Sequence, residues 1–144
     1  MTFVIDASAM VLALLGQSSD AVALRSRLRT EDCHAPSLVD AEVGNVLRRS
    51  VLRKELPPED ARALLAASWP LVDYRHEMTG SLATAAWALR ENVTFYDALY
   101  VALAVALSVP LVTADVRLSK APGLACATQL VGASAPNQAG PGGR

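Results

Sequence analysis

The sequence lacks an excess of charge of one sign, and it lacks a long uncharged apolar run. Its 144 residues carry 13 Lys and Arg against 14 Asp and Glu, so the formal net charge is −1. Such a chain has no overall attraction to nucleic acid or to an acidic membrane, and any attraction must come from local patches. The longest uncharged apolar run, residues 98–107, is about half of what a bilayer crossing requires. We therefore expect no membrane association.

Motifs of several common protein classes are also missing. No basic leader is present and Asp6 interrupts the first apolar run, so we expect a cytoplasmic protein without a signal peptide. The absence of GxxxxGK(S/T) and GxGxxG argues against binding of nucleoside triphosphates or dinucleotides. Cys33 and Cys126 lie far apart without CxxC spacing, which predicts free, partly buried thiols. His34 and His76 have no partners at ligand spacing, and we expect ordinary loop or surface histidines.

What the sequence does have is an alternation of short apolar β-branched runs with helical patterns. Hydrophobic residues make up 52% of the chain, which is the composition of a folded domain. Residues 3–5 and 111–113 predict short strands, and residues 37–54, 79–91 and 95–107 predict helices. This alternation predicts an α/β fold in which a short, mostly parallel central sheet is flanked by helices on both faces.

The chain shows no internal repeat and no domain boundary. Residues 1–132 are predicted to form one domain, and residues 133–144, which are rich in Pro, Gly and small polar residues, are predicted to form a disordered tail. Within the domain, Trp87 and Leu89 are expected to lie in the core or on a dimer surface.

Four acidic residues occupy positions where a parallel sheet would bring them together. Asp6 and Asp115 follow predicted strands, and Asp97 lies in the first turn of an apolar helix. Glu42 lies on an earlier helix. Ligands of open α/β sheets bind beyond the carboxyl ends of the strands, and crossover helices begin at that edge, so we expect one acidic site there. Each acid alone also fits a structural role, as a helix cap, a turn residue or a solvated side chain.

Helical periodicity does not choose between Glu42 and its neighbour Asp40. Val39, Val43, Val46 and Ser50 mark the side of this helix that is predicted to be buried. The two acids flank that side on opposite edges, so the pattern alone leaves both possible.

Converging carboxylates repel each other and need compensation. Two unit charges about 4 Å apart interact by roughly 4 kcal/mol at the effective dielectric of a protein surface. Either the pKa values rise or a divalent cation lies among the acids. Mg²⁺ or Mn²⁺, hard cations with oxygen ligands, are the simplest candidates, and the absence of a His-Cys set argues against zinc.

Four stretches in a fixed order, FVIDASA, PSLVDAEVGNVLRR, FYDALYVALA and PLVTADVRL, resemble the PIN-domain ribonucleases. More narrowly, they resemble the VapC-type toxins of bacterial type II toxin–antitoxin pairs. The resemblance runs from Thr2 to about Leu130. It implies a PIN-like three-layer sandwich, Mg²⁺-dependent endoribonuclease activity with Mn²⁺ as a possible substitute, an RNA substrate, a homodimer, and neutralisation by a VapB-type antitoxin.

The resemblance also implies roles for individual residues. The family's four catalytic acids fall on Asp6, Glu42, Asp97 and Asp115, with Glu42 preferred to Asp40 because it is the acid of the A-E-V-x-N-x-L stretch. We expect Asp6, Asp97 and Asp115 to hold the metal and Glu42 to orient or deprotonate the attacking water. Ser8 and Thr113 match hydroxyl residues that accompany the first and last acids, and we expect them to support the carboxylates.

Basic residues near the acids are candidates for holding RNA phosphates. Arg117 follows Asp115 by two residues, and Arg48 and Arg49 lie downstream of Glu42 on the same helix. The basic helix could equally be a solvated surface, or it could contact acidic groups of the antitoxin.

Three further classes of protein share features with this sequence. A receiver domain would need a lysine at a late strand end, and neither Lys54 nor Lys120 follows an apolar strand. A PIN-fold nuclease outside a toxin–antitoxin pair and a non-catalytic binding module of the same fold are the remaining alternatives. The presence of all four acids argues against the binding module, because it would gain nothing from their repulsion.

Overall fold

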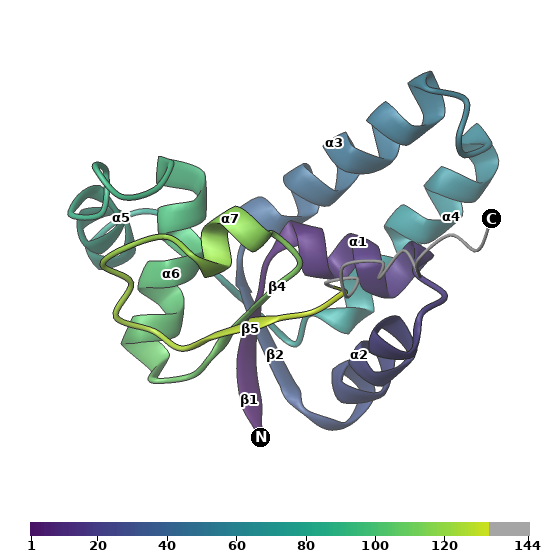
Figure 1. Ribbon diagram of the computed structural model, residues 1–144. Coiled ribbons are helices and arrows are strands. Elements are labelled where there is room, and N and C mark those ends of the chain that lie inside the picture. The colour runs from purple at the N-terminus through teal and green to yellow at the C-terminus, as the bar shows by residue number, and fades with distance from the viewer. Residues whose placement is uncertain (133–144) are drawn as a thin grey trace, which may run out of the picture.

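A parallel sheet of five short strands forms the middle of the molecule. The computed structural model describes residues 1–132, with strands in the order β3-β2-β1-β4-β5 (Figure 1). Every pair of neighbouring strands is parallel, so the predicted, mostly parallel central sheet is confirmed and is parallel throughout. The strands are β1 Thr2–Ile5, β2 Asp32–Pro36, β3 Tyr74–His76, β4 Leu111–Thr113 and β5 Thr128–Leu130.

Helices cover both faces of this sheet and produce three layers. Figure 1 shows α1 to α4 on one side of the sheet and α5 and α6 on the other, with α7 above the end of β4. The helices are α1 Ala7–Leu15, α2 Ser19–Thr30, α3 Leu38–Leu52, α4 Pro58–Ser68, α5 Ser81–Trp87, α6 Phe95–Leu107 and α7 Val116–Ser119, with a short 3-10 turn, Trp69–Leu71, after α4. The predicted α/β sandwich is therefore confirmed.

The core lies between the layers and is made mainly of aliphatic side chains. Phe3, Val4 and Ile5 of β1 and Leu111 and Val112 of β4 are fully buried. A strand covered on both faces needs apolar residues at successive positions, and both strands have them. Because the faces are covered, polar side chains of these strands reach solvent only where the strands end. The N-terminus of α6 lies at that edge too, because α6 runs back across the sheet before β4.

The two histidines correct one prediction. His34 in β2 and His76 in β3 lie on neighbouring strands, and His34 Nδ1 and His76 Nε2 are 2.9 Å apart. The prediction of ordinary loop or surface histidines is wrong, because both lie in strands, are partly buried, and are paired by a parallel register that joins distant positions of the chain. Burial lowers the pKa of His34, and the nearby His76 lowers it further. The cysteines fit the prediction of free thiols: Cys33 is buried and Cys126 is half-buried.

Within residues 1–132, no single helix is both long enough and apolar enough to cross a membrane. α1 and α2 meet that test only when taken together, and a bend of 108° separates them. The predicted disordered tail, residues 133–144, lies outside the described residues.

Candidate active site

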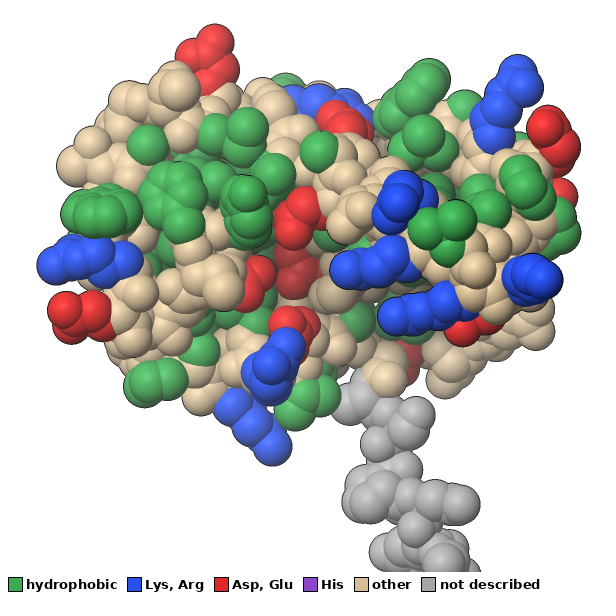
Figure 2. Space-filling view, turned by 90° about the horizontal axis from the view of Figure 1, so that it is seen from above, with side chains coloured by type: hydrophobic (Ala, Val, Ile, Leu, Met, Phe, Trp, Pro, Cys, Tyr) green, Lys and Arg blue, Asp and Glu red, His purple; other side chains and the backbone are tan. Residues whose placement is uncertain are grey.

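The four predicted acids line one pocket at the carboxyl edge of the sheet. Asp6 and Asp115 come from the ends of β1 and β4, Glu42 from α3 and Asp97 from α6. The pocket has a volume of about 280 Å³, and Figure 2 shows carboxylates gathered in a hollow at the centre of this end of the molecule. Its other lining residues are Ala7, Ser8, Asn45, Val46, Arg49 and Tyr100.

Asp6 is the most deeply buried of these acids. Its side chain is 5% exposed, and one oxygen accepts hydrogen bonds from the Ala9 N–H at 2.9 Å and from Ser8 Oγ at 2.6 Å. The other oxygen accepts a hydrogen bond from Thr113 Oγ1. Burial raises the pKa of Asp6 and nearby Asp97 adds to the rise, while the three hydrogen bonds oppose it. Asp6 therefore caps α1 and also faces the pocket.

Hydroxyl groups of Ser8 and Thr113 tie the ends of β1 and β4 together. The two oxygens are 3.3 Å apart, the Ala114 N–H donates to Ser8 Oγ at 2.9 Å, and the Asp115 N–H donates to Thr113 Oγ1 at 3.0 Å. Both hydroxyls also donate to the Asp6 carboxylate. Asp6 and the backbone that carries Asp115 are thus held by one hydrogen-bond network.

The choice between Glu42 and Asp40 is decided by packing. Glu42 lines the pocket and accepts a 2.6 Å hydrogen bond from Tyr100 Oη. Asp40 points elsewhere, where Arg75 donates to both of its oxygens at 2.7 and 2.9 Å. Burial is the main cause that raises the pKa of Glu42, and the nearby carboxylates of Asp97 and Asp6 raise it further, against the hydrogen bond from Tyr100.

Asp97 and Asp115 lie at helix N-termini and line the pocket at the same time. Thr94 Oγ1 accepts a 3.2 Å hydrogen bond from the Asp97 N–H at the start of α6. Asp115 accepts hydrogen bonds from the Arg117 and Leu118 N–H groups at 2.9 and 3.3 Å. Burial raises the pKa of Asp97, Asp115 adds to the rise, and Thr94 and Arg117 oppose it. A structural role and a place in the pocket are therefore compatible for both acids.

The donor set fits a hard cation with several water ligands. Among residues 1–132, no three His, Cys, Asp or Glu side chains are close enough to hold an ion jointly. Mg²⁺ does not need such a cage, because it binds through one or two carboxylates and retains water. Burial and the neighbouring carboxylates raise the pKa values of Asp6, Glu42 and Asp97, and a bound cation would offset the negative charge that burial disfavours. Zinc instead prefers closed ligand sets that contain His or Cys.

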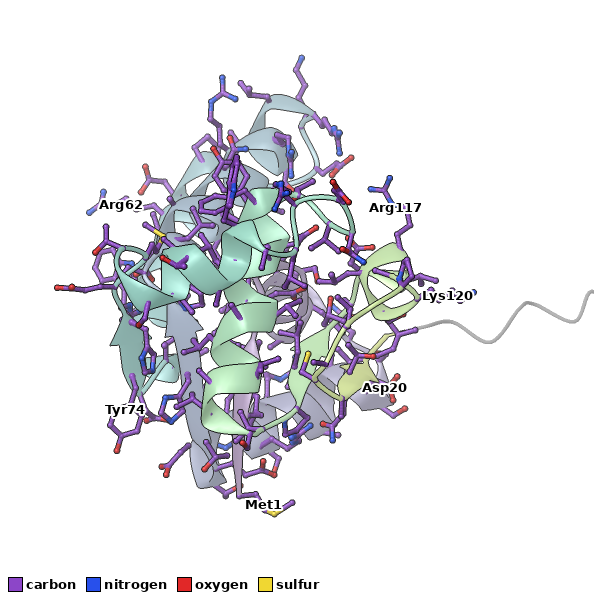
Figure 3. The ribbon with its side chains drawn as sticks, turned by 90° about the vertical axis from the view of Figure 1, so that its left-hand side faces the viewer. Met1, Asp20, Arg62, Tyr74, Arg117 and Lys120 are labelled. Atoms are coloured by element: carbon purple, nitrogen blue, oxygen red, sulfur yellow. The ribbon has the colours of Figure 1, made fainter. Side chains whose placement is uncertain are left out.

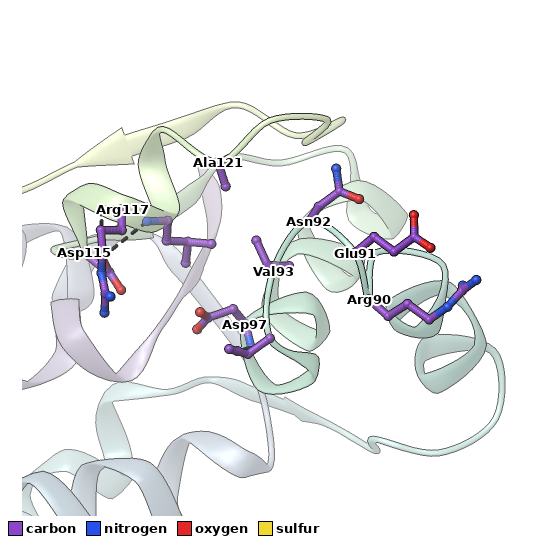
Figure 4. A pocket seen from close by; sticks show the side chains of 10 residues that line it. Arg90, Glu91, Asn92, Val93, Asp97, Asp115, Arg117 and Ala121 are labelled. Atoms are coloured by element: carbon purple, nitrogen blue, oxygen red, sulfur yellow. Dashed lines mark hydrogen bonds between the residues drawn. The ribbon is translucent and has the colours of Figure 1, made fainter.

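A second cavity, of about 490 Å³, adjoins the acidic pocket and shares Asp97 and Asp115 with it. Figure 4 shows Asp97 on one wall, with Asp115 and Arg117 opposite, and Arg90, Glu91 and Asn92 further out. Figure 3 shows that Arg117 and Lys120 both lie on the α7 side of the molecule.

The three predicted RNA-binding arginines are placed differently. Arg117 lines the second cavity and Arg49 lines the acidic pocket, whereas Arg48 lines neither.

Sequence reasoning missed Tyr100 and Asn45. Tyr100 lies three residues after Asp97 on α6, and Asn45 lies three residues after Glu42 on α3. Helical positions three or four apart share a face, and this spacing is the signal that would have found them. The same spacing favours Arg49 over Arg48, because Arg49 lies four residues after Asn45.

The raised pKa values predict how the stability of the metal-free protein depends on pH. A carboxyl whose pKa is higher in the folded state binds protons more tightly there, so its contribution favours folding at low pH and is lost as pH rises through the folded pKa. For Asp97, this loss begins above the ordinary value of 3.8. In urea unfolding with chelator, Asp97→Asn should therefore gain stability relative to the wild type as pH rises. A difference that is constant with pH would contradict this.

Comparison with known proteins agrees with this fold. The PIN-domain family profile matches residues 3–124. Ribonuclease VapC1 of Mycobacterium tuberculosis is 53% identical over 128 residues, which are 89% of this chain and 96% of that protein. Ribonuclease VapC9 of the same organism is 42% identical over 116 residues, covering 81% and 87% of the two chains. A crystal structure of VapBC2 from Rickettsia felis bound to a promoter DNA fragment matches with a TM-score of 0.68 at 15% identity, over 91% of this chain and 99% of that chain.

The chain therefore belongs to the PIN-domain family. Within that family, its identity to these relatives over nearly their whole length makes it a member of the VapC ribonucleases. The structural match, at its low identity, supports the fold alone.

Proposed function

We propose that this protein is a Mg²⁺-dependent endoribonuclease and the toxin of a toxin–antitoxin pair. The observation that carries the proposal is the pocket in which Asp6, Glu42, Asp97 and Asp115 converge from four elements. Membership of the VapC ribonucleases supports the activity, because the relatives at 53% and 42% identity carry that name.

The cation would be held mainly by Asp6 and Asp97, and Asp115 would bind it through water. When bound, Mg²⁺ supplies a water molecule of lowered pKa and offsets negative charge that develops on the phosphate; Mn²⁺ is a possible substitute. Ser8 and Thr113 fix the orientation of the Asp6 carboxylate, so that this ligand does not have to reorganise when the ion arrives.

Glu42 is the proposed general base. Burial raises the pKa of Glu42, which makes its carboxylate a stronger base. The 2.6 Å hydrogen bond from Tyr100 occupies Oε1 and leaves Oε2 to face the water. Glu42 would take a proton from the attacking water as its oxygen bonds to phosphorus. The phosphorus–oxygen bond opposite then breaks, and the leaving oxygen takes a proton, so that one phosphate end and one hydroxyl end form.

RNA phosphates would approach between two basic groups. Arg49 and Arg117 line the two cavities that meet at Asp97 and Asp115. A phosphodiester strand that follows both cavities passes the acids, and the two guanidinium groups offset its charge on either side. Arg48, on the exposed part of α3, would meet RNA further out or the antitoxin.

The proposed protein partner is a VapB-type antitoxin. Structures that match this chain include VapBC2 of Rickettsia felis and FitAcB of Neisseria gonorrhoeae, the latter at a TM-score of 0.62. The expected homodimer is part of the same proposal. A nuclease outside such a pair would share the site and lack the inhibitor, so co-purification with the product of an adjacent reading frame separates the two.

The decisive experiment is cleavage of a panel of structured RNAs by the purified protein, with Mg²⁺ and with chelator, followed by sequencing of the new ends. We expect discrete internal cuts with Mg²⁺ that disappear with chelator and return when the ion is restored. Cleavage that persists in chelator would contradict metal dependence. If no RNA is cut under any condition, a non-catalytic binding module becomes the better assignment.

A further inference from the structure

Three exposed aromatic side chains form an aromatic patch that the proposed chemistry does not use. Trp87 at the end of α5 is 61% exposed, and Phe95 and Tyr96 in the first turn of α6 are 40% and 61% exposed. The Trp87 and Phe95 rings meet edge to face, with centroids 6.5 Å apart. Of the two places predicted for Trp87, the core is therefore wrong: α5 buries Ala86 against α6 and turns the neighbouring indole outward.

This patch is conspicuous because aromatic residues are scarce in the chain. The whole sequence has two Phe, two Trp and three Tyr. Two of these rings, Trp87 and Phe95, meet on the surface, and the exposed Tyr96 directly follows Phe95 in the chain. Large exposed apolar groups of this kind mark interaction sites. A fold stabilised by aliphatic packing does not require them there.

The patch lies beside the acidic site. Tyr96 immediately precedes Asp97, which lines both cavities, and the second cavity extends along residues 90–94 between α5 and α6. Figure 2 shows hydrophobic side chains gathered beside the central carboxylates on the α5–α6 side, with Lys and Arg side chains on the α3 side. An RNA strand that runs from α3 across the acidic pocket would therefore meet the aromatic rings next.

The chemistry of the patch fits nucleobases better than an apolar protein segment. Arg90 lies over the Trp87 ring with its guanidinium carbon 5.5 Å from the ring centroid, and Arg117 lies across the second cavity. Aromatic rings interleaved with cations are the combination that binds single-stranded nucleic acid, since rings stack on bases while cations meet phosphates. A purely hydrophobic partner would leave these guanidinium groups without counter-charges.

We propose that the aromatic patch of Trp87, Phe95 and Tyr96 stacks one or more unpaired bases of the RNA beside the phosphate to be cut. This inference rests on the proposed ribonuclease function. It adds that the RNA is unpaired next to the phosphate that is cut. A base in a duplex has both faces covered by its neighbours, whereas a base in a loop or single strand presents a free face to the rings. The protein should therefore select an unpaired segment, with Trp87 as the main stacking residue.

Fluorescence of Trp87 tests the contact directly, because the only other tryptophan is Trp69, in the turn after α4. In Asp97→Asn protein that also carries Trp69→Phe, a short single-stranded RNA should quench the emission of Trp87. A duplex of the same sequence, or an abasic strand of equal length, should quench much less. The matched variant with Trp87→Phe, in which Trp69 is the reporter, should not respond. Equal quenching by duplex and single strand, or binding detected by anisotropy without quenching, would overturn the proposal.

Kinetics of otherwise wild-type protein give the second test. Trp87→Leu should raise KM for single-stranded RNA by about tenfold, the loss expected for one stacked base, with kcat and thermal midpoint nearly unchanged. Trp69→Leu should alter neither constant. If Trp87→Leu instead changes the oligomeric state or antitoxin binding and leaves KM unaltered, the patch is a protein interface and the inference fails while the nuclease stands. If wild-type protein cuts no RNA, both proposals fall.

Discussion

Asp97→Asn is expected to lower metal-dependent RNA cleavage by about 10²–10³-fold, the largest loss predicted for a substitution that preserves the fold. Asp97 is one of the two acids that line both cavities, so under the proposed function it would hold the cation next to the bound RNA. An amide of the same shape remains neutral and is a poor ligand for Mg²⁺. Initial rates at saturating Mg²⁺, and again across a range of Mg²⁺ concentrations, measure the loss and separate weakened metal binding from weakened catalysis.

Thermal unfolding in chelator provides the control for Asp97→Asn. The variant should be as stable as the wild type or more stable at neutral pH, because burial and Asp115 disfavour the Asp97 charge and raise its pKa. The hydrogen bond from the Asp97 N–H to Thr94 Oγ1 uses only backbone from residue 97, so the cap of α6 is retained. Cleavage at the wild-type rate would remove Asp97 from the site. Loss of folding would mean that its structural role is the larger one.

Glu42→Gln and Asp40→Asn form a matched pair of substitutions on α3 with opposite expected results. Glu42→Gln should reduce the cleavage rate by about a hundredfold, because the amide cannot accept a proton from water. It keeps a carbonyl oxygen that can accept from Tyr100 Oη, so the fold should be unaffected. Asp40→Asn should leave the cleavage rate unchanged and cost at most about 1 kcal/mol in stability, since its ion pair with Arg75 is partly exposed.

The measurement for this pair is single-turnover cleavage with saturating enzyme, together with urea unfolding. Single-turnover rates report the chemical step for Glu42→Gln without interference from product release. An equal loss of activity in both variants would mean that the charge of α3, and not the Glu42 carboxylate, matters. Full activity in Glu42→Gln would exclude Glu42 as the base.

Much of the fold could be predicted because its signals are local. The runs at residues 3–5 and 111–113 are short, apolar and β-branched, each is followed closely by an acid, and the structure has β1 and β4 there. Thr94 at the start of α6 and the apolar length of that helix indicated its limits well, and observed and predicted bounds agree. Helix caps and strand patterns depend on neighbours in sequence, so they can be read without the rest of the chain.

Predictions failed where the answer depended on a partner distant in the chain. His34 and His76 meet because β2 and β3 pair in one particular register. The predicted helix at residues 79–91 ends early, at Trp87, and Trp87 points outward. Tyr100 was overlooked because its role depends on Glu42, which is 58 residues away. The histidine pairing and the outward direction of Trp87 have no sign in the local pattern, whereas Tyr100 has one, its position three residues after Asp97 on the same helix.

The sequence by itself determined that Asp6, Asp97, Asp115 and one acid of α3 are spaced along an alternating α/β chain so that the carboxyl edge of a parallel sheet gathers them. The family resemblance favoured Glu42 over Asp40, but only the tertiary structure gave the physical reason. The two positions are about 200° apart around α3 at 3.6 residues per turn, so one acid faces the pocket and the other must face away. Which of them does so depends on Arg75 and Tyr100, supplied by β3 and α6. A helix fixes the directions of its side chains relative to each other, but only packing against other elements decides which side chain faces the pocket.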